Sequence, residues 1–220
     1  MSSPSNPPPG HASEDLLFDG PPDAPVRVIL AHGAGAAMDT PFMTHFAQGL
    51  AANGLRVVRF EFPYMAARRR DGKRRPPDGQ AKLLERWHAV IAAQAADPGV
   101  VKPVIGGKSL GGRMASLIAD DVGAAGLVCL GYPFHPASKP EKLRTAHLES
   151  LKTPGLFVQG TRDALGNREE VAGYALSPAI RLHWAEDGDH SLVPRKASGR
   201  SAEQNWDEAV AAIAKFIASL

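Results

Sequence analysis

A serine, a histidine and an acidic residue, which are types that cooperate in nucleophilic catalysis, each follow an apolar run in this sequence. The serine is Ser109, within the segment GKSLG at 107–111. This segment fits the pattern G-x-S-x-G of a nucleophile elbow, a strained turn from a strand into a helix. The pattern is short enough to arise by chance, but here it directly follows an apolar run and directly opens a helical window. We therefore predict that Ser109 is a nucleophile, with an ordinary helix N-cap as the alternative.

A serine nucleophile requires a base that accepts its hydroxyl proton. His190 is the predicted base, because it lies in the loop sequence DGDHS between the last apolar run and the last helical window. His135, in the loop after the fourth apolar run, is the alternative. The sequence therefore places the base about eighty residues after the nucleophile.

The base in turn requires an acid that fixes its tautomer. Asp163 is the predicted acid, since it follows the apolar run at 155–159 after a short Gly-Thr-Arg turn. A helix cap is the alternative for this residue. Asp187 and Asp189 are nearer to His190 in the sequence, but neighbouring side chains diverge in direction, and we interpret both as residues that shape the turn.

The segment HGAG at 32–35 follows the first apolar run and is predicted to stabilise negative charge on a substrate oxygen. Acyl transfer develops that charge, and fixed backbone N–H groups stabilise it. We predict that the N–H groups of Ala34 and Leu110 form this oxyanion hole, and that His32 braces the loop. A dinucleotide-binding loop is disfavoured, because Met38 stands where its third glycine would be.

Residues 107–109 (GKS) also match the end of a phosphate-binding P-loop, which makes a nucleotide binder an alternative. The first glycine of that motif would fall at position 102, which is occupied by Lys102. The apolar run also continues almost directly into the glycine, without room for a phosphate loop. This alternative is therefore weak.

Short apolar runs alternate with helical windows along the chain, which predicts an α/β fold with a mostly parallel sheet of about six strands and helices on both faces. The expected strands are 26–31, 55–60, 104–106, 126–130, 155–159 and 180–184, and the expected helices are 41–53, 80–96, 110–121, 168–174 and 201–220. In such sheets the chemistry gathers at the carboxyl ends of the strands. A single domain is predicted over 14–220, preceded by a disordered lead-in at 1–13.

The composition is that of a globular domain, with 220 residues and 44% hydrophobic residues. With 25 basic and 23 acidic side chains, the charge gives no reason to expect nucleic acid or a membrane as a partner. Cys129, the single cysteine, lies in an apolar run and is expected to be a buried thiol. We find no secretory signal or membrane span and expect a cytoplasmic protein, with no cofactor and no metal site.

With these motifs the chain resembles small, lidless bacterial α/β-hydrolases, a group of predicted hydrolases akin to dienelactone hydrolases and to the testis-expressed hydrolase-like proteins. The segments that carry the resemblance are AHGAGAAMDTPFM, RFEFPYM, GGKSLGGRMAS, GYPFHPASKPEKLRT, QGTRDALG and DGDHSL. The resemblance implies a Ser109–Asp163–His190 triad, whose chain order is that of α/β-hydrolases. Two departures stand out: dienelactone hydrolases use a cysteine where Ser109 stands, and the full fold has eight strands. Residues 16–18 are a candidate remnant of the missing ones.

The expected function is hydrolysis of a small carboxylic ester or related acyl substrate through an acyl-enzyme on Ser109. The segment 131–154 is too short for a helical lid domain, which favours small acyl groups. Tyr64, Tyr132 and Phe134 are candidate pocket walls, with loop packing as the alternative. A catalytically silent interaction module of the same fold also stays open, and the sequence does not give the oligomeric state.

Residues 68–75 hold six basic side chains and one acid. A solvated loop is the usual meaning of such a run. Because the run follows the second strand on the predicted active edge, it could also attract an anionic substrate.

Overall fold

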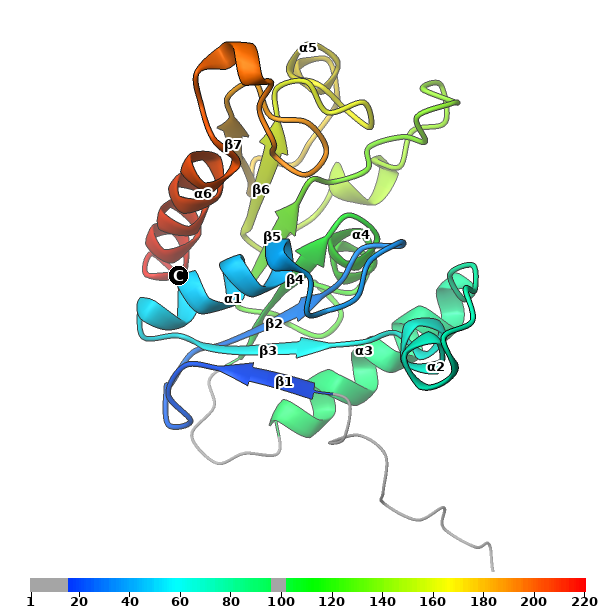
Figure 1. Cartoon of the computed structure of the whole chain (residues 1–220). Helices are drawn as coiled ribbons and strands as arrows, with labels where there is room; N and C mark the ends of the chain where they lie inside the picture. Colours follow the sequence, from blue (N-terminus) through cyan, green and yellow to red (C-terminus); the bar gives the residue numbers. More distant parts are fainter. Residues whose placement is uncertain (1–15, 96–101) are drawn as a thin grey trace, which may run out of the picture.

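The computed structural model describes residues 16–95 and 102–220. The predicted disordered lead-in at 1–13 lies outside these residues. Strands and helices alternate along the described chain (Figure 1). The strands are β1 (Leu16–Asp19), β2 (Arg27–Ala31), β3 (Arg56–Phe60), β4 (Val104–Lys108), β5 (Gly126–Leu130), β6 (Gly155–Gly160) and β7 (Ile180–Ala185). The helices are α1 (Pro41–Ala52), α2 (Pro63–Asp71), α3 (Gln80–Ala95), α4 (Leu110–Ser116), α5 (Arg168–Ala172) and α6 (Ala202–Ile217).

The described strands form one sheet in the order β1-β3-β2-β4-β5-β6-β7. All neighbouring pairs are parallel except β1 with β3, which is antiparallel. The six predicted strands are confirmed, and the candidate remnant at 16–18 is the antiparallel edge strand β1. The chain therefore has a mostly parallel α/β sheet of seven strands in its described part.

Helices cover both faces of the sheet, because its central strands are apolar on both sides. In β2, Ile29 and Ala31 face one core and Val28 and Leu30 face the other. Helices α1 and α6 pack on the second of these cores, and α2, α3 and α4 pack on the first (Figure 1). The two helical layers hold the strands, and therefore the loops at their carboxyl ends, in fixed positions.

Cys129 lies in the middle of β5, fully buried beneath α4. Its Sγ lies 3.6 Å from the carbonyl oxygen of Gly112, in α4. Burial raises the pKa of this thiol well above its ordinary value. The expectation of a buried thiol is confirmed.

The sequence suggested a loop for the whole basic run at 68–75, but the first half of the run is helical. Residues 68–71 form the last turn of α2, which ends at Gly72 with φ 72°. Basic side chains are favourable there because the carbonyl end of a helix is partly negative. Arg69 is fixed further by ion pairs with the buried Glu61, at 2.6 Å, and with Asp39, at 2.9 Å.

The crossover between β5 and β6, at 131–154, contains a single turn of 3-10 helix, Ala146–Leu148, and no lid domain. Pro133, Pro136 and Arg144 of this crossover line a pocket with Ser109, and its last residues return to the start of β6. None of the helices in the described residues is both long and apolar enough to cross a membrane.

Candidate active site

Ser109 occupies the sharp turn between β4 and α4. Its backbone has φ 49° and ψ −110°, a conformation that residues with a side chain adopt rarely. The turn points the hydroxyl away from the sheet, and the side chain stays partly accessible. This is the geometry of a nucleophile elbow.

The glycines of the GKSLG segment are required by close packing rather than by flexibility. A Cβ atom on Gly111 would lie 2.4 Å from the carbonyl oxygen of Ala31 in β2, and one on Gly107 would lie 2.1 Å from the same oxygen. A side chain at Gly111 would push the start of α4 off the sheet, and one at Gly107 would collide with the neighbouring strand β2. The two glycines therefore allow the turn that carries Ser109 to sit directly over β2.

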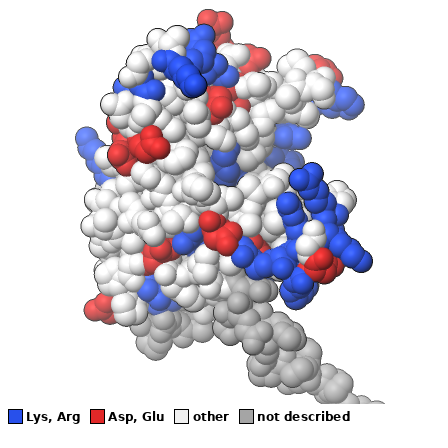
Figure 2. Space-filling view, in the orientation of Figure 1, with Lys and Arg blue, Asp and Glu red and all other residues white. Residues whose placement is uncertain are grey.

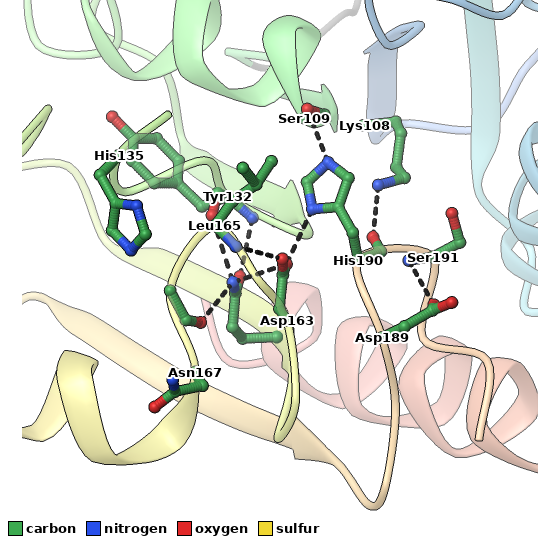
Figure 3. A network of polar contacts seen from close by, with 12 residues as sticks. Lys108, Ser109, Tyr132, His135, Asp163, Leu165, Asn167, Asp189, His190 and Ser191 are labelled. Atoms are coloured by element: carbon green, nitrogen blue, oxygen red, sulfur yellow. Dashed lines mark hydrogen bonds and ion pairs between the residues drawn. The ribbon is translucent and has the colours of Figure 1, made fainter. Parts of the chain in front are cut away.

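The structure brings the three predicted catalytic residues into one hydrogen-bonded chain (Figure 3). His190 Nε2 lies 2.9 Å from Ser109 Oγ, and His190 Nδ1 lies 2.8 Å from Asp163 Oδ2. Because a carboxylate only accepts, the Nδ1 proton is assigned to the bond with Asp163. This leaves Nε2 as the acceptor for the hydroxyl proton of Ser109. The alternative base, His135, is buried elsewhere, 3.5 Å from a carboxylate oxygen of Glu170.

Asp163 is fully buried and is held by more than the histidine. Its Oδ1 accepts the backbone N–H of Leu165 at 2.8 Å, and its Oδ2 accepts a side-chain N–H of Gln159 at 2.9 Å. The Gln159 side chain is itself buried in β6, and its Oε1 accepts the N–H of Tyr132. The sequence analysis did not select Gln159, although a single polar residue near the end of an apolar strand could have indicated it.

The loop that carries His190 is fixed by Lys108 and Asp189. Lys108 donates from its ammonium group to the carbonyl oxygen of His190. Burial lowers the pKa of Lys108 to about 8, and the nearby Asp163 and Asp189 oppose this effect. Asp189 accepts the backbone N–H groups of Ser191 and Val193 and so shapes the turn, as predicted.

The same contact argues against the P-loop alternative. In that motif the lysine reaches toward a bound phosphate. Here Lys108 turns toward the His190 loop, and its ammonium group is engaged by a backbone carbonyl.

Ala34 and Leu110 line one pocket together with Ser109, and the pocket has a volume of about 380 Å³. Between described residues, neither backbone N–H donates a hydrogen bond. For Leu110 the reason is that the first amides of a helix have no acceptor within it. A Cβ atom on Gly33 would lie 3.7 Å from that of Ser109, so the 32–35 loop passes directly beside the serine.

The 32–35 loop is braced from below by two ring side chains. Buried His32 accepts the N–H of Phe62 at Nε2, 3.1 Å away, and its Nδ1 lies 2.7 Å from the carbonyl oxygen of Gly33. Burial lowers the pKa of His32, which favours the neutral ring that this pairing requires. The Tyr64 hydroxyl donates to the carbonyl oxygen of Ala34 at 3.0 Å.

The predicted pocket walls Tyr64, Tyr132 and Phe134 do not line the pocket at Ser109. All three are buried in the core below it. The rings of Tyr132 and Phe134 pack edge to face with centroids 4.8 Å apart. Following a strand places a residue at the active edge but does not decide whether its side chain faces the solvent or the core. Their burial favours loop packing, the alternative given for these three residues.

The pocket wall consists instead of three prolines, Leu165 and two arginines, Arg113 and Arg144. The sequence analysis did not select either arginine. Arg113 could have been found from its spacing, because a residue four positions after Ser109 lies on the same side of a helix. Arg144 lies in the long crossover at 131–154 and carried no comparable signal.

Comparison with known proteins gives the same fold. A family model described as an alpha/beta hydrolase domain matches residues 24–218. A lidless α/β serine hydrolase from Xanthomonas campestris superposes with a TM-score of 0.69 at 19% identity, covering 89% of this chain and 85% of that one. A dienelactone hydrolase from Anabaena variabilis superposes with a TM-score of 0.70 at 20% identity, covering 93% and 90%.

Est1E from Butyrivibrio proteoclasticus superposes with a TM-score of 0.69 at 15% identity, covering 92% of this chain and 94% of that one. Identities this low establish a shared fold alone. The family model, by contrast, spans nearly the whole described chain. The chain belongs to the alpha/beta hydrolase domain family.

Proposed function

We propose that this protein is a serine hydrolase that cleaves a small carboxylic ester or related acyl substrate through an acyl-enzyme on Ser109. The observation that carries the proposal is the chain of hydrogen bonds from Ser109 through His190 to Asp163. Beside it, Ala34 and Leu110 line the same pocket, and their backbone N–H groups donate no hydrogen bond to a described residue. A serine that only caps a helix would not need a histidine at 2.9 Å and a buried carboxylate behind it.

In the first step His190 Nε2 accepts the hydroxyl proton as Ser109 Oγ attacks the acyl carbonyl carbon. The carbonyl oxygen becomes negative, and the N–H groups of Leu110 and Ala34 stabilise it. Asp163 stabilises the imidazolium that forms. When the carbon–oxygen bond to the alcohol breaks, His190 donates its proton to the departing oxygen.

The acyl group then remains on Ser109 Oγ as an ester. A water molecule attacks that ester while His190 Nε2 accepts the water's proton. Collapse of the second tetrahedral intermediate returns the proton to Ser109 and releases the carboxylic acid. Base catalysis of this kind contributes about 10²–10⁴-fold to the rate.

The structural relatives support a hydrolase function but do not identify the substrate, so we infer its size from the pocket. Est1E has also been solved with ferulic acid bound, and that structure has 16% identity and a TM-score of 0.67. The pocket of this protein, at about 380 Å³, lies at the small end of the range for ligand sites. Small acyl groups therefore fit it better than long lipid chains.

The test combines covalent labelling with turnover. A neutral fluorophosphonate probe and p-nitrophenyl acetate are given to the wild type, to Ser109→Ala and to Ser191→Ala. Ser191 is a matched control, because it lies next to His190 and its hydroxyl makes no hydrogen bond with the described residues, whereas its backbone does. We expect labelling and turnover in the wild type and in Ser191→Ala, and a loss of about 10³-fold or more in Ser109→Ala.

Two outcomes would contradict the proposal. Equal turnover by the wild type and Ser109→Ala would mean that another group cleaves the ester. An unlabelled and inactive wild type would favour the silent interaction module.

A further inference from the structure

Two arginines line the pocket that contains Ser109, and they come from different parts of the chain. Arg113 belongs to α4, and its backbone N–H donates to the carbonyl oxygen of Ser109 at 2.9 Å. It therefore lies one helical turn after the serine, on the same side. Arg144 comes from the crossover at 131–154 and reaches the same pocket.

The backbone of Arg144 is fixed where it approaches the pocket. Its N–H donates to the carbonyl oxygen of Phe134 at 2.7 Å, and its carbonyl oxygen accepts the hydroxyl of Tyr132 at 2.9 Å. Since Tyr132 is buried, this anchor ties the crossover to the core. Arg144 is thus presented by a supported segment and not by a free loop.

Neither guanidinium has an acidic partner among the described residues. Arg113 Nε is buried and has no acceptor there, and no acid lines the pocket. Other arginines of this chain are paired, such as Arg69 with Glu61 and Arg195 with Asp187. A buried donor without an acceptor is unfavourable, and no described side chain satisfies this Nε–H of Arg113.

The two cations also act on each other and on their surroundings. Burial lowers the pKa of Arg144, and the positive charge of Arg113 lowers it further. Behind them, burial and the charge of Arg113 lower the pKa of His147 to about 4, so this ring is neutral at physiological pH. Two like charges held at one small site repel each other unless an anion lies between them.

We propose that Arg113 and Arg144 form an anion subsite beside Ser109, and that the preferred substrates are esters carrying a carboxylate or a phosphate group. The proposal rests on the serine hydrolase function proposed above and adds its substrate class. Planar guanidinium groups suit such a ligand, because each offers paired N–H donors that match two oxygen atoms.

The surroundings of the pocket favour the approach of an anion. Lys and Arg side chains gather over α2 and the segment that follows it (Figure 2). That segment reaches the pocket through Pro77. A field of one sign around a cleft raises the local concentration of oppositely charged ligands.

The test compares two esters of equal shape in the full chain. One is the p-nitrophenyl monoester of glutaric acid, and the other is its neutral isostere, in which an isopropyl group replaces the carboxylate. The readout is the ratio of their kcat/KM values in the wild type, Arg113→Gln, Arg144→Gln and Arg74→Gln. Arg74→Gln measures what the surrounding basic surface contributes, since Arg74 is exposed, unpaired among the described residues and outside the pocket. Hydrolysis by Ser109→Ala supplies the background.

We expect the wild type to prefer the glutarate ester, and each pocket variant to lower the ratio about tenfold, through KM rather than kcat. Arg113→Lys should restore part of the ratio, because it keeps the charge but loses the planar donor pair. Arg74→Gln, which removes one of several exposed charges around the pocket, should lower the ratio much less than either pocket variant. Inhibition of neutral ester turnover by glutarate and by glycerol phosphate then distinguishes carboxylate from phosphate as the preferred group.

The outcomes separate the two proposals. Turnover and fluorophosphonate labelling of the wild type with no preference for the glutarate ester, and with no inhibition by either anion, would overturn the anion subsite and leave the hydrolase intact. A preference that survives in both pocket variants and falls in Arg74→Gln would overturn it in favour of the basic surface. No labelling and no turnover of either ester would instead overturn the hydrolase function itself.

Discussion

Replacing Lys108 by methionine should stabilise the protein and impair its catalysis at the same time. The pKa of this lysine falls from 10.5 to about 8 because the ammonium group is buried. At about 1.36 kcal/mol per pKa unit, holding the charged form costs the folded state about 3 kcal/mol at neutral pH. Methionine fills the same space without a charge but loses the hydrogen bond to the His190 carbonyl, worth about 1 kcal/mol. We therefore expect the free energy of unfolding at pH 7 to rise by about 2 kcal/mol.

The effect on stability should depend on pH in a known direction. Between about pH 8 and 10.5 the unfolded chain holds the Lys108 proton and the folded chain does not, so the unfolded state binds more protons. The wild type should gain stability from this group as the pH rises through that window. Lys108→Met should lack that rise, and its advantage over the wild type should vanish by about pH 10.5.

The effect on catalysis follows from the position of His190. Without Lys108 the loop loses one of the contacts that position the ring 2.9 Å from Ser109 Oγ, while the bond of the ring to Asp163 remains. Displacements of about 1 Å in an active site reduce rates by about 10²-fold, so kcat/KM for p-nitrophenyl acetate should fall about 10- to 100-fold. Lys108→Arg, which keeps a charged donor, should recover part of it.

Denaturant unfolding and ester turnover from about pH 6 to 10.5 measure both effects, with Lys139→Met, at an exposed position, as the control. The reasoning would be refuted by a Lys108→Met protein that is less stable than the wild type at pH 7. A variant that keeps the wild-type kcat/KM would refute the positioning role alone.

Two further outcomes are expected from the same structure. Gly111→Ala should cost about 3 kcal/mol of unfolding free energy, because its Cβ would lie 2.4 Å from the carbonyl oxygen of Ala31. Gly35→Ala, with no atom within 4 Å of the added Cβ, should leave the Tm unchanged, and equal Tm values for the two variants would contradict the packing argument. Burial and Arg113 lower the pKa of His147 to about 4, so the unfolded chain binds more protons between about pH 4 and 6.5 and stability should fall as the solution is acidified through that range. His147→Gln should flatten this dependence by about 1–2 kcal/mol after allowance for solvent screening, as measured by urea unfolding at about pH 7 and 4.5.

The parallel strands and the hydrogen-bonded chain of Ser109, His190 and Asp163 could be predicted because each rests on a local pattern. A short apolar run marks a strand that is buried on both faces, and Ser109, Asp163 and His190 each follow such a run within a few residues. The carboxyl ends of parallel strands share one edge, so order along the chain was enough to bring the three residues together.

The features that were missed depend on contacts between distant segments. Helix α2 was taken for part of a loop because its last turn is basic and only its first turn is buried. Tyr132 and Phe134 follow a strand, yet their rings turn into the core, a choice made by the packing of neighbouring helices and loops. The place of Arg144 depends on a hydroxyl group twelve residues earlier in the chain. Contacts of this kind cannot be inferred from the spacing of residues in the sequence.

Cys129 is positioned so that its modification can report the separation of α4 from β5. The thiol is the single cysteine of the sequence and is fully buried beneath the helix that starts at Leu110. A thiol-reactive reagent therefore reaches it only after α4 has moved off β5, since burial also keeps it protonated. The rate of its modification reports how often the helix that follows Ser109 separates from the sheet, without any engineered label.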